Sequence, residues 1–385
     1  MIDFYKIIIK GSFGEGNFGD DALMLVLSRI IGNICSEDNY AFICNADAGY
    51  INNIIPSVAI IRKGCIESYS SNLLLYGGGT QFFSFNNGGK TIEDNINKIL
   101  KLFNDGIIKN IALRIRKKSC GREGIKYRYM ASLGIGIGPF SEKKDAIRIA
   151  KLFSLMSYVA VRDKNSYEFC QSHEISKAGL YSDLCFLPNI FDDSLRSDFT
   201  ELQKVKKRIG VIVRDWSHDD KGIAYSESIK NVINTLRDFE CEVTYILFAG
   251  KNDVQWLKDI VRNNETYILW DPNTDTVEGF IKKLSIFDLF ITARYHGAVF
   301  GALLGKPSVC IGIEPKLIQI SEIMGDGGRL WNYPFIEEEC VSAVMSVIKE
   351  YKKAISAISE FVKMQGDLAD DMIKSFVDFA DYIKI

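Results

Sequence analysis

The feature that most constrains the fold is a rhythm of short apolar runs that recur every 25 to 40 residues. In the first half of the chain these runs are Ile7–Ile9, Tyr40–Cys44, Val58–Ile61, Leu73–Tyr76, Met130–Ile137 and Tyr158–Val161. Helix-period stretches lie between several of them, at 22–31, 92–103 and 145–156. Runs that are apolar throughout indicate strands buried on both faces. Their alternation with helices predicts a parallel sheet covered by helices.

The alternating pattern of apolar runs and helical stretches is interrupted once, at residues 188–208, and then resumes. The later runs are Ile209–Val213, Val243–Phe248, Tyr267–Leu269, Leu289–Thr292 and Ser308–Ile311, with helical stretches at 226–239, 254–262 and 277–284. At roughly 150 residues per domain, the 385 residues suffice for two domains. We therefore predict an α/β fold of two Rossmann-like domains, 1–190 and 205–335, that face a cleft. Residues 336–385 are predicted to form C-terminal helices that pack on the domains.

Composition excludes several classes of protein. Lys and Arg total 47 against 49 Asp and Glu, so the formal net charge is −2 and no nucleic-acid partner is expected. The nine cysteines form no C-x-x-C pair, which argues against a disulfide framework or a zinc ribbon. We expect no signal peptide, and the sequence contains no apolar run of the roughly 20 residues that span a bilayer. We expect a reduced, soluble protein of the cytoplasm.

Glycine-rich loops follow two strands of the first domain. The first loop contains the G-x-G-x-x-G string of a dinucleotide fingerprint, but it begins too far beyond the strand and is followed at once by Asp20 and Asp21. We expect no NAD or FAD there, and Asp20 either caps the next helix or faces a ligand. In the second loop, Gly77–Gly79, Gly78 and Gly79 either form a tight turn or let the backbone contact a ligand.

Basic residues follow three strands of the second domain. Arg214 follows the run 209–213, Arg294 and His296 follow 289–292, and Lys316 lies just beyond 308–311. Ligands of parallel sheets bind beyond the carboxyl ends of the strands. Arginine forks bind carboxylate and phosphate, and a lysine adds a mobile charge. The pattern predicts a small anionic substrate that carries both groups.

Histidine is scarce, and this narrows the choice of functional residues. Of His173, His218 and His296, only His296 lies in a motif at a predicted strand-to-helix turn. His218, four residues after Arg214, is the second candidate. The histidines are dispersed and form no cluster with cysteines, so no metal site is expected. Binding of Mg²⁺ through the phosphate of a ligand stays an alternative.

Two further basic features belong to the first domain. Arg162 follows the run 158–161 and either pairs with Asp163 or contacts a ligand. Residues 109–128 carry eight Lys and Arg against one Glu. That stretch is either a solvated loop or a patch that meets an anionic acceptor, such as a lipid-diphosphate-linked sugar or the inner membrane leaflet. The near-P-loop at 89–91 lacks a leading strand and is not expected to bind nucleotide.

Six short motifs occur in order along the chain. They are Asn17-Phe18-Gly19-Asp20, Gly77-Gly78-Gly79, Gly136-Ile137-Gly138-Pro139, Val161-Arg162-Asp163-Lys164-Asn165-Ser166, Ala293-Arg294-Tyr295-His296 and Pro315-Lys316. The ordered set resembles the polysaccharide pyruvyl transferase family over residues 17–316. The resemblance implies a glycosyltransferase-B-like fold. It also implies transfer of the pyruvyl unit of phosphoenolpyruvate onto a sugar, as a cyclic ketal, with release of phosphate and no cofactor.

The resemblance also implies roles for single residues. In the second domain, the donor side, it matches Arg294 and His296 to the family's Arg-x-His site, Lys316 to a downstream lysine and Arg214 to a donor-binding arginine. In the first domain, the acceptor side, Arg162 matches the arginine of the valine-arginine-aspartate motif. Asn17, Asp20 and the glycine loop would face the acceptor sugar, with Asp20 as the base on the attacking hydroxyl. An imidazole titrates near neutral pH, so His296 suits a general acid or a phosphate clamp. The acceptor would be a sugar of a surface polysaccharide or of its lipid-linked precursor.

Three positions depart from the family's pattern. Tyr295 replaces the usual leucine, Glu314 stands where aspartate is commoner, and the segment around Asp183 matches an Asp-Pro-x-Phe motif only loosely. We expect none of the three to touch a charged donor, and the role of Asp183 stays open. Two alternative functions also stay open: a nucleotide-sugar-dependent glycosyltransferase of the same fold, and a non-catalytic component of polysaccharide assembly.

Overall fold

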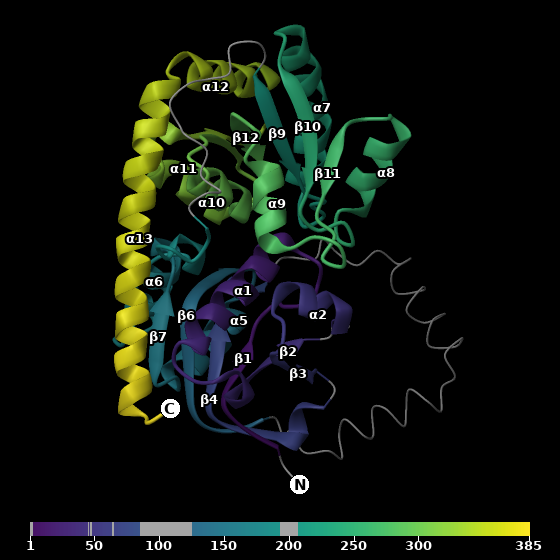
Figure 1. Cartoon of the computed structure of the whole chain (residues 1–385). Coiled ribbons are helices and arrows are strands. Elements are labelled where there is room, and N and C mark those ends of the chain that lie inside the picture. Colours follow the sequence, from purple (N-terminus) through teal and green to yellow (C-terminus); the bar gives the residue numbers. More distant parts are fainter. Residues whose placement is uncertain (1–2, 45, 47, 64, 85–124, 193–206) are drawn as a thin grey trace, which may run out of the picture.

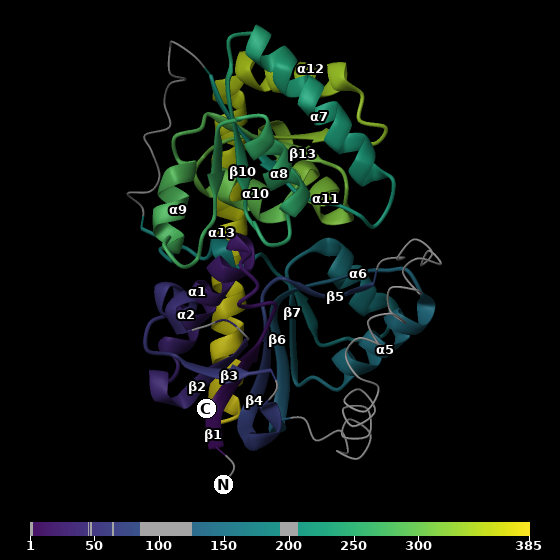
Figure 2. The same ribbon diagram turned by 90° about the vertical axis from the view of Figure 1, so that its right-hand side faces the viewer.

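The computed structural model describes residues 3–44, 46, 48–63, 65–84, 125–192 and 207–385. Two α/β lobes are stacked one on the other, and a long C-terminal helix, coloured yellow, runs beside both (Figures 1 and 2). Each lobe is built around one parallel sheet. The predicted α/β fold with two sheets and C-terminal helices is confirmed.

Within the described residues, the first sheet has eight strands, and all paired neighbours are parallel. The strands are β1 (Asp3–Lys10), β2 (Tyr40–Cys44), β3 (Ala59–Arg62), β4 (Tyr69–Gly77), β5 (Thr80–Ser84), β6 (Lys126–Phe140), β7 (Tyr158–Val161) and β8 (Ala178–Leu180). The main path is β3-β2-β1-β4-β6-β7-β8, and β5 pairs with β6. The order reverses between β1 and β4, so a crevice opens beyond their carboxyl ends. The helices are α1 (Phe18–Gly32), α2 (Ala48–Ile54), α5 (Lys143–Ser154) and α6 (Lys164–Ser172).

The second sheet has the order β11-β10-β9-β12-β13-β14 and is also parallel. Its strands are β9 (Arg208–Val213), β10 (Glu242–Leu247), β11 (Tyr267–Leu269), β12 (Leu289–Thr292), β13 (Ser308–Ile311) and β14 (Gly328–Trp331). Its helices are α7 (Lys221–Asp238), α8 (Val254–Arg262), α9 (Val277–Leu284), α10 (Tyr295–Leu303) and α11 (Pro315–Ile323). Here the order reverses between β9 and β12, the strands that precede Arg214 and Arg294.

The central strands are buried on both faces, as their continuous apolar runs predict. All residues of β12 and β13 are buried, and so are all but the first residue of β9. The sequence did not predict β5, β8 and β14. The helix predicted at 92–103 lies outside the described residues, and so do 193–206 of the predicted domain boundary.

The two lobes meet in an aromatic contact at the start of α1. Phe18 is fully buried, and its N–H donates to the carbonyl oxygen of Phe248 at 2.8 Å. Its ring lies 4.6–5.3 Å from four aromatic rings of the second lobe, those of Phe248, Trp270, Phe280 and Phe300. The first turn of α1 is therefore fixed against the second lobe, together with the loop before it.

Helices α12 (Glu337–Lys349) and α13 (Tyr351–Tyr382) occupy the C-terminal residues. The buried residues of α13 recur every three or four positions, as in an amphipathic helix. The helix follows the second lobe and then reaches the first (Figure 1), where the ring of Phe379 stacks on Tyr158 at 5.2 Å. Gln365 accepts a hydrogen bond from Ser182 Oγ at 2.8 Å. In the part of the chain that the structure describes, no helix has the length and apolarity to cross a membrane.

Candidate functional site

The carboxyl ends of the two sheets line a single cavity of about 670 Å³ between the lobes. The first lobe contributes the loop after β1, the β4–β5 turn, the end of β6 and the β7–α6 turn. The second lobe contributes the ends of β9, β10, β12 and β13. Of the residues that the sequence predicted for the site, the cavity is lined by Asn17, Asp20, Gly79, Arg162, Arg214, His218, Arg294, His296 and Lys316.

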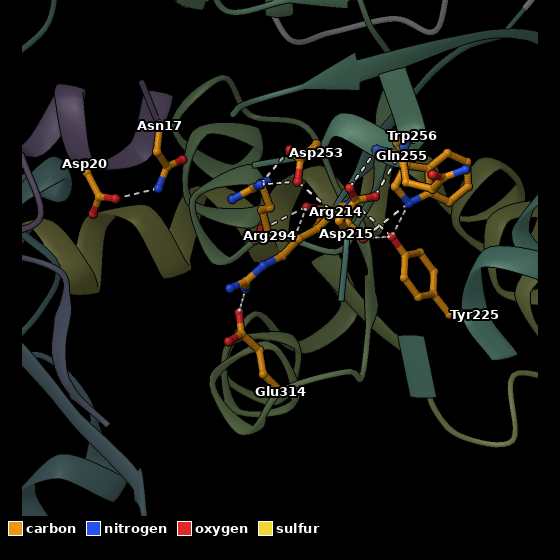
Figure 3. A network of polar contacts seen from close by, with 11 residues as sticks. Asn17, Asp20, Arg214, Asp215, Tyr225, Asp253, Gln255, Trp256, Arg294 and Glu314 are labelled. Carbon is orange, nitrogen blue, oxygen red and sulfur yellow. Dashed lines mark hydrogen bonds and ion pairs between the residues drawn. The ribbon is translucent and has the colours of Figure 1, made fainter. Parts of the chain in front are cut away.

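The predicted cations of the second lobe are held by buried carboxylates (Figure 3). Arg294 Nη2 donates to both oxygens of Asp253, each at 2.6 Å. Arg214 Nη1 donates to Glu314 Oε1 at 2.8 Å, and Lys316 Nζ lies 3.1 Å from the same oxygen. These acids fix the cations before any ligand arrives, and they are themselves stable in the interior only because they are paired.

Glu314 is therefore part of the cation cluster, which the sequence did not indicate. Its side chain is only 5% exposed. Burial alone would raise the pKa of Glu314, but Lys316 and Arg214 hold it below its usual value, so the carboxylate stays ionised. Burial lowers the pKa of Lys316, against the opposing effect of Glu314.

Arg162 lies buried at the end of β7. Its Nη1 donates to Asp183 Oδ2 at 2.7 Å, and its Nη2 donates to Thr80 Oγ1 at 2.9 Å. The predicted partner Asp163 is farther away, with 3.8 Å between its Oδ2 and Arg162 Nε. The guanidinium also lies 4.3 Å from the ring centroid of Tyr295, within the range of a cation–π contact. Asp183, whose role the sequence left open, is thus the main partner of Arg162.

His296, in the first turn of α10, is held between the two lobes. Its Nε2 is buried and lies 3.6 Å from Asp183 Oδ2. On the Nδ1 side the ring packs against Gly19 of α1, where an added Cβ would lie only 2.2 Å from Nδ1. Burial alone would raise the pKa of Asp183, but contacts with His296 and Arg162 hold it well below its usual range. Asp183 therefore provides a fixed negative charge beside the imidazole.

The first lobe presents Asn17 and Asp20 to the cavity from the start of α1. Asn17 is the N-cap residue, and its Nδ2 donates to Asp20 Oδ2 at 2.5 Å (Figure 3). Gly79 packs closely against Asp20. Its φ is +72°, and a Cβ added to it would lie only 3.3 Å from Asp20 Oδ1. Gly78 does not line the cavity, and its contact with substrate stays a prediction. Its N–H donates to Leu133 O at 2.9 Å, so it shapes the turn.

His218 lines the cavity beside Arg214, as its position in the sequence suggested. Its ring packs edge-to-face on Trp216 at 4.7 Å, and the guanidinium of Arg214 lies 4.8 Å from the same indole. Burial lowers the pKa of His218, and the charge of Arg214 lowers it further. His218 is therefore a neutral imidazole at neutral pH and not an additional cation.

The lining as a whole does not carry the basic excess that the cations alone suggest. It contains four Lys and Arg residues against six Asp and Glu. Two of those acids, Asp163 and Asp215, accept hydrogen bonds from backbone N–H groups at the starts of α6 and α8. Helix starts carry partial positive charge, which offsets these acids. At α10 and α11 no side chain caps the helix start, so the partial positive charge there favours an anion. Some backbone donors are already used: α11 begins with Pro315, which has no N–H, and the N–H of Leu317 donates to Glu314 O.

One cluster has metal-ligand spacing that the sequence did not predict. Ligand atoms of Asp183, Cys185 and His296 lie within 4.8 Å of one another. Burial raises the pKa of the Cys185 thiol well above its ordinary value, whereas a metal needs the thiolate. Asp183 is already paired with the cation Arg162. The cluster therefore fits a charge network better than a metal site.

Sequence reasoning missed Asp253, Glu314 and Thr80 as site residues. Asp253 lies beyond the end of β10 and Glu314 beyond the end of β13, so the strand-end rule that found the cations would also have found these acids. Thr80 gives no such signal. The near-P-loop at 89–91 and residues 109–124 of the basic stretch lie outside the described residues, and contact of that stretch with an acceptor or membrane stays a prediction.

Each of the two parallel α/β domains opens onto the cleft where its strand order reverses. Two such domains facing each other define a glycosyltransferase-B-like fold. Solved structures of similar fold include UDP-GlcNAc 2-epimerase from Neisseria meningitidis bound to UDP-GlcNAc, at 11% identity and a TM-score of 0.58 over 97% of this chain and 99% of that one. Staphylococcus aureus MnaA with UDP aligns at 9% identity and a TM-score of 0.57, over 100% and 98% of the two chains. At these identities the likeness shows the fold alone.

The sequence pattern of polysaccharide pyruvyl transferases matches residues 17–315. The chain therefore belongs to the polysaccharide pyruvyl transferase family, which makes it a transferase of polysaccharide biosynthesis. The match begins at the N-cap of α1 and ends at the first residue of α11, so it includes β4 of the first sheet and both β9 and β12 of the second. A comparison with curated proteins found no significant match.

Proposed function

We propose that the protein transfers the pyruvyl unit of phosphoenolpyruvate onto a sugar of a surface polysaccharide or its lipid-linked precursor. The product is a cyclic ketal, and phosphate is released. The observation that carries this proposal is the gathering of Arg162, Arg214, Arg294, Lys316 and His296 around one cavity whose opposite wall is the start of α1. Family membership supports pyruvyl transfer as the reaction.

The donor's carboxylate and phosphate suit the second-lobe side of the cavity. A guanidinium has five N–H donors, and the ion pairs of Arg214 and Arg294 each engage one nitrogen of the fork. The remaining N–H groups, the Lys316 ammonium and the starts of α10 and α11 are available to bind a small anion. The proposed reaction needs no cofactor, and Mg²⁺ would enter only as a counter-ion of the donor phosphate.

The reaction balances without an added reagent. A proton adds to the methylene carbon, a sugar hydroxyl attacks C2, the bond from C2 to the phosphate oxygen breaks, and a second hydroxyl closes the ketal. Of the two hydroxyl protons, one balances the new methyl group and the other leaves with phosphate. Arg294 and Lys316 stabilise the charge on the departing phosphate. His296 acts as general acid or phosphate clamp, and Asp20, oriented by Asn17, acts as base.

The first experiment measures product mass for the wild type and for His296→Ala. Incubation with phosphoenolpyruvate and candidate glycans is expected to add one pyruvylidene unit in the wild type. We expect His296→Ala to lower the rate about 100-fold or more, because it removes a group that interacts with the transition state. His173→Ala is the control, since His173 lies at the end of α6 and does not line the cavity. Absence of phosphate release with every hexoside tested would overturn the proposal.

Donor binding separates the proposal from its two alternatives. Phosphoenolpyruvate is expected to raise the unfolding temperature, because a ligand that binds only the folded state stabilises it. A shift with a nucleoside diphosphate, and none with phosphoenolpyruvate, would point to a nucleotide-sugar glycosyltransferase. Calorimetry that detects neither ligand would point to a non-catalytic component of polysaccharide assembly.

A further inference from the structure

Three phenylalanines line the first-lobe wall of the cavity, and we name them the aromatic shelf: Phe83 of β5, Phe140 at the end of β6 and Phe169 of α6. The rings of Phe140 and Phe169 have centroids 5.3 Å apart. Phe83 is 48% exposed and lines the cavity, so its ring is accessible to a ligand there. The shelf is part of the same cavity as the cations and requires its own explanation.

The local sequence places Phe83 at the cavity. Successive side chains of a strand point to opposite faces. Phe82 is buried and packs on Phe153 with ring centroids 5.1 Å apart, so Phe83 points the other way. On α6, Asn165 and Phe169 are four residues apart and both line the cavity, because this spacing puts them on one helix face.

The shelf lies at a distance from the cations along β5. Thr80, the first residue of β5, touches Arg162, whereas Phe83 lies three residues farther along the strand. Phe140 lies on the neighbouring strand, where it is in register with Ser84, the residue after Phe83. At about 3.3 Å per residue, Phe83 lies roughly 10 Å from Thr80 along β5. That span is greater than one pyranose ring.

The chemistry of the shelf fits a sugar better than the donor. Aromatic side chains offer no charge to balance a carboxylate or a phosphate. A pyranose ring has an apolar face of C–H groups that packs on an aromatic ring, and its hydroxyls need partners that both donate and accept. The amides of Asn165 on α6 and Gln319 on α11 also line the cavity and supply such partners.

We propose that the aromatic shelf binds a second sugar of the acceptor, adjacent to the sugar that receives the pyruvyl unit. The inference rests on the proposed function and adds a subsite to it: the enzyme recognises at least two sugars of the acceptor, not the reacting sugar alone. The reacting sugar lies at Asp20 and Gly79, and the next sugar of the acceptor lies farther along β5, at Phe83.

The test compares acceptors of one and two sugars. Rates of phosphate release from phosphoenolpyruvate are measured with methyl hexopyranosides and with the matching disaccharide glycosides. Phe83→Ala is expected to raise the KM for the best disaccharide about tenfold, equivalent to about 1.4 kcal/mol, and to leave the KM for the monosaccharide and kcat near wild type. The matched control is Phe239→Ala, because Phe239 is 55% exposed at the end of α7 and does not line the cavity.

A binding measurement keeps the two proposals separable. Saturation-transfer NMR with cellobiose, maltose and lactose reports contact without turnover, and we expect the strongest signal to weaken in Phe83→Ala but not in Phe239→Ala. If the wild type releases no phosphate with any acceptor, the proposed function fails and the binding result alone decides the subsite. The subsite is disproved if Phe83→Ala keeps the wild-type KM and the wild-type NMR signal for the disaccharide. It is also disproved if the variant loses activity with the monosaccharide and with the disaccharide to the same extent.

Discussion

At the scale of single residues, the sequence predicted the cations of the site but not their acids. Arg294 follows β12 and its partner Asp253 follows β10, although β9 lies between those strands in the sheet. Arg162 and Asp183 belong to the first lobe, and His296 approaches the same carboxylate from the second. Such pairs depend on how distant segments meet in space. Residue spacing along the chain can therefore place Asp253 at a strand end but cannot say which cation it pairs with.

Gly19 offers a direct test of how His296 is positioned. An alanine Cβ at Gly19 would lie 2.2 Å from His296 Nδ1 and 2.9 Å from its Cβ, so the imidazole must move. A displacement of about 1 Å at a catalytic group costs roughly 100-fold in rate. We therefore expect Gly19→Ala to lower kcat for pyruvyl transfer by about that factor. Steady-state phosphate release measures it.

Gly32→Ala is the control for this substitution. Gly32 ends the same helix, and a Cβ there would meet the Tyr40 hydroxyl oxygen at an ordinary 3.7 Å. We expect wild-type kcat for Gly32→Ala, and unfolding curves are compared to exclude loss of fold. A Gly19→Ala enzyme with wild-type kcat would show that the ring position of His296 does not matter for the chemistry.

At the scale of elements, a continuous apolar run decided which strands the sequence revealed. The bounds predicted for β2, β7, β11, β12 and β13 agree with the structure. The missed strands β8 and β14 lie at sheet edges, and β5 lies off the main path. Edge strands are buried less completely, so they need no continuous apolar run. The edge strands β3 and β11 have such a run and were predicted, whereas β8 and β14 lack one. Gly-Arg-Leu-Trp in β14 and Thr-Gln-Phe-Phe-Ser in β5 show this.

The strand-end rule located the site because the relevant strands are neighbours. Arg214, Arg294 and Lys316 follow β9, β12 and β13, which lie side by side in the second sheet. The rule names positions but not side-chain directions. It therefore included Gly78, whose N–H pairs within the first sheet, and it did not single out the aromatic shelf. Alternation along β5 would have placed Phe83 opposite Phe82, had that strand been recognised.

At the scale of the whole molecule, contacts across the lobes hold the cavity walls in place. Phe18 is buried among four rings of the second lobe, and α13 contacts both lobes. The sequence predicted C-terminal helices but not that one of them spans the two sheets. Helical periodicity reports that a face is buried and does not say against what. The lobes therefore form one unit in which the starts of α1 and α10 meet.

Asp21 joins the lobes beside Phe18 and makes the stability of the molecule dependent on pH. The side chain is fully buried and accepts hydrogen bonds from the hydroxyl of Tyr50 on α2, at 2.6 and 2.7 Å, and from the indole of Trp270 in the second lobe, at 2.8 Å. Burial raises the pKa of Asp21 from 3.8 to about 7, the two donors oppose the shift, and the nearby charge of Asp20 adds to it.

The sign of the pH dependence follows from the raised pKa of Asp21. Between about pH 4 and 7 the folded state keeps a proton that the unfolded state has lost, so stability falls as pH rises through that range, by at most about 1.4 kcal/mol per pH unit. Asp21→Asn cannot titrate, and its free energy of unfolding in urea should fall less steeply than that of the wild type between pH 5 and 7. Asp38→Asn, at an exposed position, is the control and should follow the wild type. If the free energy of unfolding falls equally steeply with pH in the wild type and in Asp21→Asn, Asp21 is ionised in the folded protein. Its negative charge would then be stabilised by the hydrogen bonds from Tyr50 and Trp270.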